Sequence, residues 1–202
     1  MKNIPPNCIF KQKDIAETAM EIINKAFRPD PEASSSQDIF EYLFSQDVGA
    51  IAGGMPRDHF FSKPATDIDI FLFANRLNCD KEHWGQFIIS AFNQKDWQIS
   101  LMERDSDNHM YSMNAMDVFE FTSPEGMPGN VIISHTGDVG QLMHSFPCNL
   151  SKICWLKDET FMHEDFMHGV VNKSLELDRM FGKTDYLSKM LKKFPHFQLR
   201  MV

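Results

Sequence analysis

Two kinds of hydrophobic spacing alternate along this chain. Apolar residues three and four positions apart predict amphipathic helices, whereas short continuous or alternating apolar runs predict strands. Ile15, Ala19 and Ile22 show the helical spacing, and Ile68, Ile70 and Leu72 show the strand spacing. The spacing predicts helices over 13–27, 37–45, 81–93, 139–146, 164–171 and 185–194, helical turns over 55–61, a loop over 29–36, and strands over 48–52, 67–73, 97–103, 115–121, 131–134 and 150–155.

The mixture of helices with a modest sheet indicates the α+β (mixed α/β) class, with the sheet flanked by helices and a small helical appendage at the C-terminus. A length of 202 residues suits one domain. We therefore expect a single domain over 1–202, with N-terminal helices in 1–46, the core in 47–156 and a helical tail in 157–202.

One segment combines two acidic residues with a preceding glycine pair. Asp67 and Asp69 lie two apart in a predicted strand, so both side chains point to the same face. Two neighbouring carboxylates repel each other unless a cation lies between them. Carboxylate oxygens are the ligands that Mg²⁺ prefers, together with substrate phosphates, and Mn²⁺ has the same preference. The pair therefore predicts a divalent-metal site.

Gly53 and Gly54 end one predicted strand and begin a short helix. Glycine lets the backbone approach a ligand closely, and the first turn of a helix offers free N–H groups to an anion. Arg57, one turn later, adds a charged donor for phosphate. These three residues are the predicted binding site for a triphosphate. His59 follows them, and we interpret it as an ordinary exposed histidine, with nucleotide contact as the alternative.

This segment resembles the signature of the head domain of poly(A) polymerases and tRNA CCA-adding enzymes, written G-G-x-V-R-D-x-L-L-G-[RK]-x-P-x-D-x-D. The family belongs to the DNA-polymerase-β-like nucleotidyltransferase superfamily, and the chain resembles its compact bacterial or phage-type members. Twelve residues separate Gly54 from Asp67, as in the signature, and Arg57-Asp58 falls on its Arg-Asp pair. Pro56 and Ser62 depart from the signature.

The resemblance implies a polymerase-β-like sheet and a template-independent enzyme that moves a nucleoside monophosphate from an NTP to an acceptor hydroxyl. Asp67 and Asp69 would be the catalytic metal ligands for Mg²⁺ or Mn²⁺, and Gly53, Gly54 and Arg57 would bind the NTP. The acceptor is an RNA end or a protein. The alternative is a non-catalytic nucleotide-binding or regulatory module derived from such a head domain.

A third acid usually comes from a later strand in this superfamily. Asp117 and Glu120 lie on such a strand but on opposite faces, so at most one of them serves. We favour Asp117 over Glu120, and the remaining alternative is that neither serves. Later in the chain, Pro147 and Asn149 stand where the resembling block carries an acidic residue and an arginine, which favours the non-catalytic alternative.

The net charge of −8 argues against a large sequence-independent grip on nucleic acid and fits a protein acceptor somewhat better. Basic residues near the C-terminus form either a solvated helix face or a local basic strip: Lys183, Lys189, Lys192, Lys193 and Arg200. The four cysteines show no metal-binding spacing and predict buried, reduced thiols. With no apolar run long enough to cross a bilayer and no secretory leader, we expect a cytoplasmic protein without a membrane partner.

Overall fold

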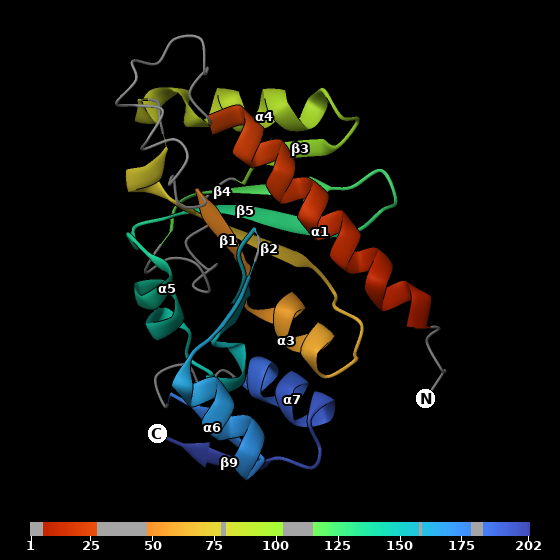
Figure 1. The fold of residues 1–202 in the computed structure, drawn as a ribbon, viewed down its shortest axis with the longest axis vertical. Helices are drawn as coiled ribbons and strands as arrows, with labels where there is room; N and C mark the ends of the chain where they lie inside the picture. The colour runs from red at the N-terminus through yellow and green to blue at the C-terminus, as the bar shows by residue number, and fades with distance from the viewer. Residues whose placement is uncertain (1–5, 28–47, 78–79, 103–114, 158, 179–183) are drawn as a thin grey trace.

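The computed structural model describes residues 6–27, 48–77, 80–102, 115–157, 159–178 and 184–202 (Figure 1). The expected loop over 29–36 and helix over 37–45 lie outside these residues. The longer helices are α1 (Pro6–Phe27), α3 (Gly54–Phe60), α4 (Trp84–Asn93), α5 (Val139–Ser145), α6 (Glu164–Asn172) and α7 (Thr184–Lys193). The strands are β1 (Gly49–Ala52), β2 (Ile68–Phe73), β3 (Gln98–Leu101), β4 (Ala115–Thr122), β5 (Pro128–Ser134), β6 (Ile153–Trp155), β7 (Thr160–Met162), β8 (Ser174–Leu177) and β9 (Gln198–Met201).

A seven-stranded mixed sheet forms the centre of the described structure, with the order β3-β4-β5-β2-β1-β6-β7. Strand β2 runs parallel to β5 and antiparallel to β1. The remaining neighbours in the sheet pair antiparallel. The mixed α+β class expected from the hydrophobic pattern is confirmed.

Helices cover both faces of this sheet (Figure 1). Helices α1 and α4 pack on one face, where Ile68, Ile70 and Leu72 of β2 are completely buried. Helix α5 packs on the other face, against Phe71 and Phe73 of the same strand. The alternation along β2 therefore separates two apolar layers, and Asp69 belongs to the face that α5 covers.

Most predicted elements are present, with shifted ends. Helix α1 begins at Pro6 rather than at residue 13, in keeping with the preference for proline in the first turn, where no intrahelical N–H bond is lost. Strand β2 begins at Ile68, so Asp67 immediately precedes it. Only the second half of the predicted strand over 150–155 is a strand. The chain first forms a 3-10 turn over Asn149–Ser151 and pairs with its neighbours from Ile153 onward.

The two helices predicted for the tail are confirmed as α6 and α7, but the tail also contains strands that the pattern did not predict. Strands β8 and β9 pair in parallel and form a separate two-stranded sheet. Apolar side chains of β8, of α7 and the residue after it, and of the segment around Cys148 form a third cluster: Cys148, Leu150, Leu175, Leu177, Met190 and Phe194. Strand β7, also unpredicted, pairs with β6 at the end of the main sheet.

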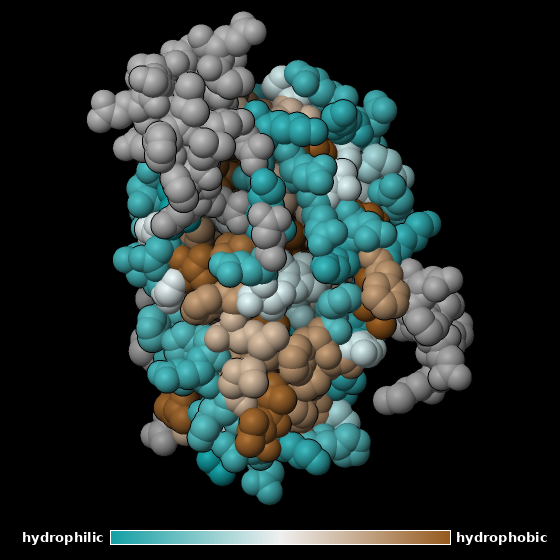
Figure 2. All heavy atoms as spheres, in the orientation of Figure 1, coloured by the Kyte–Doolittle hydropathy of each residue, from teal (hydrophilic) through white to brown (hydrophobic). Residues whose placement is uncertain are grey.

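The molecule carries hydrophobic surface over the part where α3 and α6 lie (Figure 2). Phe60, Met167 and Val171 are exposed there. Among the helices that the structure describes, none combines the length and apolar character needed to cross a membrane.

Candidate functional site

The predicted glycine turn joins β1 to α3. Gly53 has a φ of 78° and a ψ of −117°, a conformation that residues with a side chain rarely adopt. Helix α3 then begins at Gly54. The local fold therefore requires glycine at position 53 and directs the chain away from the end of β1.

Both predicted carboxylates lie against this turn. Strands β1 and β2 pair so that Ala52 is opposite Asp69. A Cβ atom built on Gly53 would lie 3.9 Å from Asp69 Oδ2, and one built on Gly54 would lie 3.8 Å from Asp67 Oδ1. The glycine pair and the acidic pair, separated in the sequence, thus lie side by side, and the ring of Phe146 borders Gly53 as well.

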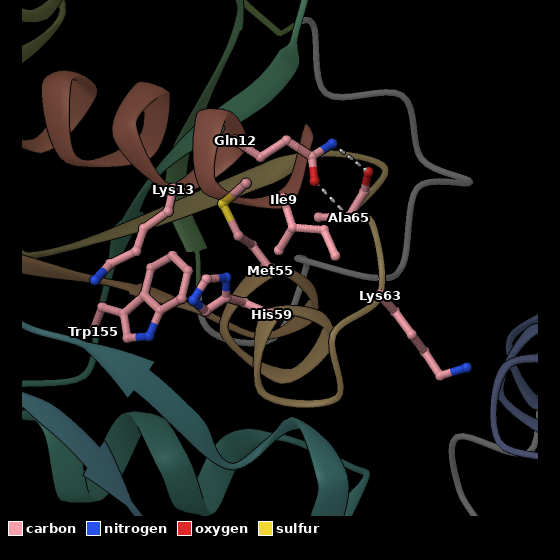
Figure 3. Close-up of a pocket in the computed structure, with 8 residues that line it drawn as sticks. All are labelled: Ile9, Gln12, Lys13, Met55, His59, Lys63, Ala65 and Trp155. Atoms are coloured by element: carbon pink, nitrogen blue, oxygen red, sulfur yellow. Dashed lines mark hydrogen bonds between the residues drawn. The ribbon is translucent and has the colours of Figure 1, made fainter. Parts of the chain in front are cut away.

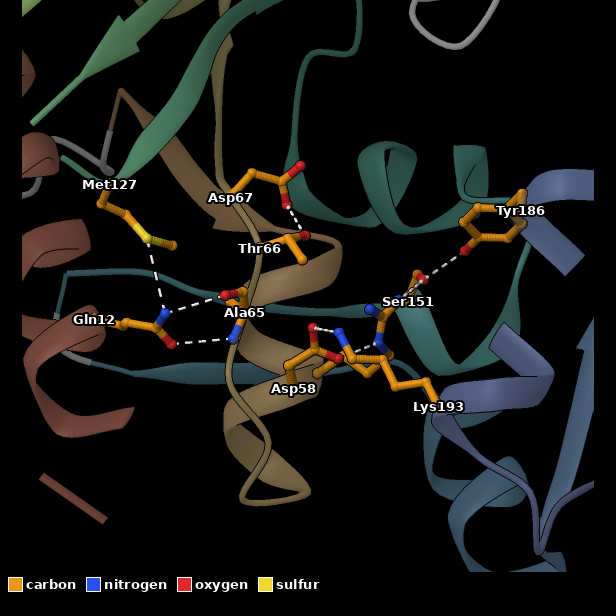
Figure 4. A network of polar contacts seen from close by, with 10 residues as sticks. Gln12, Asp58, Ala65, Thr66, Asp67, Met127, Ser151, Tyr186 and Lys193 are labelled. Atoms are coloured by element: carbon orange, nitrogen blue, oxygen red, sulfur yellow. Dashed lines mark hydrogen bonds and ion pairs between the residues drawn. The ribbon is translucent and has the colours of Figure 1, made fainter. Parts of the chain in front are cut away.

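The chemistry of this pair fits a hard divalent cation, because Asp67 and Asp69 offer carboxylate oxygens beside the glycine turn. The Thr66 hydroxyl donates to Asp67 Oδ1 at 3.1 Å (Figure 4). Within the described residues, no group of three or more His, Cys, Asp or Glu side chains gathers as a metal site. Asp67 and Asp69 remain the candidate metal ligands on their carboxylate chemistry, with phosphate oxygens of a substrate as the expected further ligands.

Asn130 is a site residue that the sequence analysis missed. It lies opposite Asp69 across the parallel β2–β5 pair, and its Nδ2 donates to Asp69 Oδ1 at 2.9 Å. Glu120 of β4 lies opposite Asn130 and so shares this face. With about 4.8 Å between neighbouring strands, the Glu120 backbone is about 10 Å from that of Asp69.

The preference for Asp117 as a third acid was wrong. Asp117 lies opposite Ile133, whose side chain is buried in the layer beneath α1 and α4. It therefore belongs to the face opposite Asp69, because the strand alternates and β4 pairs regularly from Asp117 onward. Of the two candidates, only Glu120 lies on the same face of the sheet as Asp69, and the neutral amide of Asn130 lies between them.

Arg57 is buried, with 7% of its surface exposed. Its Nε donates to Asp58 Oδ1 at 2.8 Å, and its Nη1 donates to Ser151 Oγ at 3.1 Å. Its Nη2 lies 3.7 Å from the position of a Cβ on Gly54. Burial works to lower the pKa of Arg57, but the neighbouring Asp58 carboxylate outweighs it and the pKa is raised. The guanidinium therefore stays charged beside the glycine turn.

Asp58, which is 1% exposed, compensates two cations. One oxygen accepts from Arg57, and the other accepts from Lys193 of α7. Lys193 was expected on a solvated face or a basic strip, and the structure instead pairs it with a buried acid of the core. Asn149 has a similar linking role, because its side chain donates to the Ser174 carbonyl and accepts from the Glu176 N–H.

His59 is not the exposed histidine that the sequence indicated. Its ring packs edge-to-face against Phe10 and Trp155, with centroids 6.1 Å and 5.1 Å away. It lies in a hollow beneath α1, together with Gln12 and Lys13 (Figure 3). Its Nδ1 is buried and has no hydrogen-bond partner among the described residues. This hollow adjoins the sheet face beneath α1, so His59 is not part of the carboxylate site.

A second and larger hollow also lies beside α1, and Trp155 borders both. Neither hollow is lined by the two aspartates or the glycine pair. Cys148 and Cys154 are buried free thiols, as expected, and burial raises the pKa of Cys154 to about 12. The side chains of Cys8 and Cys79 lie outside the described residues.

The environment of His59 predicts that stability falls in mild acid. Burial, and next the nearby Lys13, lower the pKa of His59 below its ordinary value. The unfolded chain therefore takes up a proton near pH 6.5, before the folded protein does, so stability is full above that pH and decreases as the pH falls below it. Thermal melts from pH 8 to pH 5.5 should show this decrease in the wild type and a smaller one in His59→Gln.

His83 provides the matched control, because its side chain is exposed. His83→Gln should leave the pH dependence of the melting temperature unchanged. Equal slopes for His59→Gln and the wild type would contradict the assignment.

Comparisons with known proteins show a fold but no family. No protein-family model matches the chain, and no curated protein sequence matches it significantly. Solved structures do match. A tRNA-processing enzyme in an apo form superposes with a TM-score of 0.53 at 7% identity, covering 94% of this chain and 44% of that one. The Thermotoga maritima CCA-adding enzyme complexed with tRNA gives 0.51 at 10% identity, covering 93% and 42%.

A CCA-adding enzyme in complex with CTP also matches, with a TM-score of 0.51 at 12% identity over 92% of this chain and 43% of that one. The chain thus spans less than half the length of the solved structures it resembles. At these identities the likeness concerns the fold alone, which this chain shares with the matched part of these CCA-adding and tRNA-processing enzymes.

Proposed function

We propose that this chain is a metal-dependent nucleotidyltransferase that moves a nucleoside monophosphate from an NTP to an acceptor hydroxyl. The observation that carries the proposal is the approach of Asp67 and Asp69 to the Gly53-Gly54 turn, within 4 Å of the space that side chains there would fill. This proximity of the acidic pair to the glycine pair supports the proposal that metal and triphosphate bind side by side.

In the proposed reaction, the acceptor oxygen forms a bond to the α-phosphorus, and the bond from that phosphorus to the β-bridging oxygen breaks. Pyrophosphate leaves, and the hydroxyl proton passes to solvent. Asp67 and Asp69 would hold Mg²⁺ or Mn²⁺, which neutralises charge on the attacking and leaving oxygens when bound. Asn130 fixes the orientation of the Asp69 carboxylate through the 2.9 Å hydrogen bond.

The glycine turn and Arg57 would position the triphosphate. Gly53 and Gly54 put no side chain beside the two carboxylates, and Arg57 supplies a permanent positive charge next to them. Such a site works mainly by positioning the reactants and by stabilising charge with groups already in place. Two acceptor classes remain. The tRNA complex of a similar structure favours an RNA end, whereas the net charge of −8 favours a protein.

A non-catalytic nucleotide-binding module is the second candidate, and Asn130 is the observation that favours it. An amide at this position leaves Asp69 without an acidic neighbour on β5, and Glu120 is one strand further away. Such a site would bind a metal–NTP complex without supporting transfer.

Transfer of label from NTPs tests the proposal. Each NTP, labelled at the α-phosphate, is incubated with the protein, Mg²⁺ or Mn²⁺, and either total RNA or lysate protein. The proposal predicts labelled RNA or protein, with release of pyrophosphate and with no product from Asp67→Asn/Asp69→Asn. NTP binding without any labelled product would favour the non-catalytic module, and the absence of both binding and product would contradict both candidates.

A further inference from the structure

We propose that helix α7 of the tail sets the NTP affinity of the site by positioning Arg57, and that Lys193 is the positioning residue through which it does so. This inference rests on the proposed function, because it assigns Arg57 to the triphosphate. Lys193 itself would not contact the substrate.

Arg57 is held by partners that α7 supplies or orients. Figure 4 shows Tyr186 and Lys193 extending from the tail toward Ser151 and Asp58. Lys193 binds one oxygen of Asp58, and the other oxygen of Asp58 accepts from Arg57 Nε. The Tyr186 hydroxyl lies 3.2 Å from Ser151 Oγ, the atom that accepts from Arg57 Nη1.

An aromatic ring from the tail completes this enclosure. The guanidinium carbon of Arg57 lies 5.7 Å from the centroid of Phe194, the residue that follows α7. The same ring packs 4.9 Å from Phe61, at the end of α3. A ring at this distance attracts a guanidinium through its quadrupole and excludes water from it. The tail therefore contacts both hydrogen-bond partners of Arg57 and packs an aromatic ring beside its guanidinium.

These contacts determine where the remaining nitrogen of Arg57 points. With Nε directed to Asp58 and Nη1 to Ser151, the planar guanidinium has a fixed orientation, and Nη2 lies beside Gly54. A free arginine side chain has many rotamers, and ordering it on binding would cost affinity. Because α7 keeps Arg57 ordered beforehand, that cost is removed from NTP binding.

Lys193 is the sharpest position at which to test this coupling. Without the charge of Lys193, Arg57 is the one cation of the described residues that pairs with Asp58, so the Arg57–Asp58 pair is free to turn together away from Gly54. Lys192 is the matched control, since it is the preceding residue of the same helix, carries the same charge and is exposed. Lys193→Gln and Lys192→Gln therefore make the same chemical change at adjacent positions of one helix.

Calorimetric titration with Mg²⁺ and a non-hydrolysable ATP analogue, well below the melting temperature of every variant, measures the coupling. The Kd should rise at least about fivefold in Lys193→Gln, the lower end of typical couplings between sites. It should be unchanged in Lys192→Gln and largely restored in Lys193→Arg, which keeps the charge. Tyr186→Phe, which removes only the hydroxyl that faces Ser151, should raise the Kd by a smaller factor.

The outcomes separate this inference from the proposed function. If Lys193→Gln melts at a lower temperature but binds with the wild-type Kd, the role of Lys193 is structural and the inference is overturned. If Lys193→Gln does not fold, an unchanged Kd in Tyr186→Phe overturns the inference and a raised Kd supports it. If the wild type binds no NTP, the inference and the proposed function are both overturned, whereas wild-type binding with no effect of either variant overturns the inference alone.

Discussion

Replacing Asp67 with asparagine should reduce nucleotidyl transfer at least about a hundredfold, the scale of losing one charge-stabilising group from an active site. An amide oxygen is a poor ligand for Mg²⁺ compared with a carboxylate. The Thr66 hydroxyl that donates to Asp67 Oδ1 can donate equally well to an amide oxygen, so the local structure should persist. Initial rates of label transfer in wild type and Asp67→Asn provide the measurement.

Thermal melts distinguish a metal site from a structural acidic pair. If Asp67 holds metal, the apo melting temperature of Asp67→Asn should equal or slightly exceed that of the wild type, because one of two repelling charges is gone. The stabilisation by added Mg²⁺ and NTP should disappear, since only a ligand that binds the native state raises the apparent melting temperature. A lower apo melting temperature with the ligand response intact would refute the metal assignment.

Asp96 offers the control for this charge change. It is exposed in the turn between α4 and β3, where its φ of 61° also suits asparagine. Asp96→Asn should therefore retain both the transfer rate and the ligand response.

Replacing Asp58 with alanine should destabilise the protein by about 3–5 kcal/mol, the usual result of removing one partner from a buried ion pair. Asp58 is 1% exposed and compensates both Arg57 and Lys193. Its removal would leave the charge of Arg57 buried against Ser151 and an aromatic ring, without a counter-ion in its present position. Urea unfolding of wild type and Asp58→Ala measures the difference.

A surface ion pair provides the comparison. Asp165 pairs with Lys152 at 2.5 Å, but its side chain is 43% exposed. Solvent-exposed pairs contribute about 1 kcal/mol or less, so Asp165→Ala should cost far less than Asp58→Ala. Similar costs for the two variants would mean that Asp58 is not the buried link between core and tail that the structure indicates.

The sequence predicted those parts of the candidate site that depend on the spacing of residues close together in the chain. Asp67 and Asp69 are two apart in a predicted strand, and only a short helix separates them from Gly54, so strand alternation and the short connection predict that both lie near the same turn. The apolar spacing likewise located the helices and the central strands, because each buries one continuous face.

Contacts between distant segments were not predictable in the same way. Asn130 is 61 residues from Asp69 in the sequence, and only the parallel register of β2 with β5 brings the two together. Strand neighbours also decided against Asp117, since alternation alone placed it and Glu120 on opposite faces without showing which face was which.

The tail shows a second limit of sequence patterns. Lys193 lies 135 residues from Asp58 in the sequence. The pattern of basic residues near the C-terminus is the same whether Lys193 faces solvent or a buried acid. Strands β8 and β9 have four residues each, too few for alternation to be recognised, and α7 separates them in the chain. Tertiary packing, rather than local spacing, makes them a sheet.

The most direct test of the account is the position of the metal. Crystals grown with Mn²⁺ and a non-hydrolysable ATP analogue allow the metal to be located by its anomalous scattering. We expect a peak between the carboxylates of Asp67 and Asp69, with the triphosphate of the analogue beside Gly53 and Gly54. Two results would contradict the metal assignment. One is a nucleotide bound beside Gly53 and Gly54 without metal at the two aspartates. The other is a metal–nucleotide complex bound in either of the two hollows beside α1 that Trp155 borders.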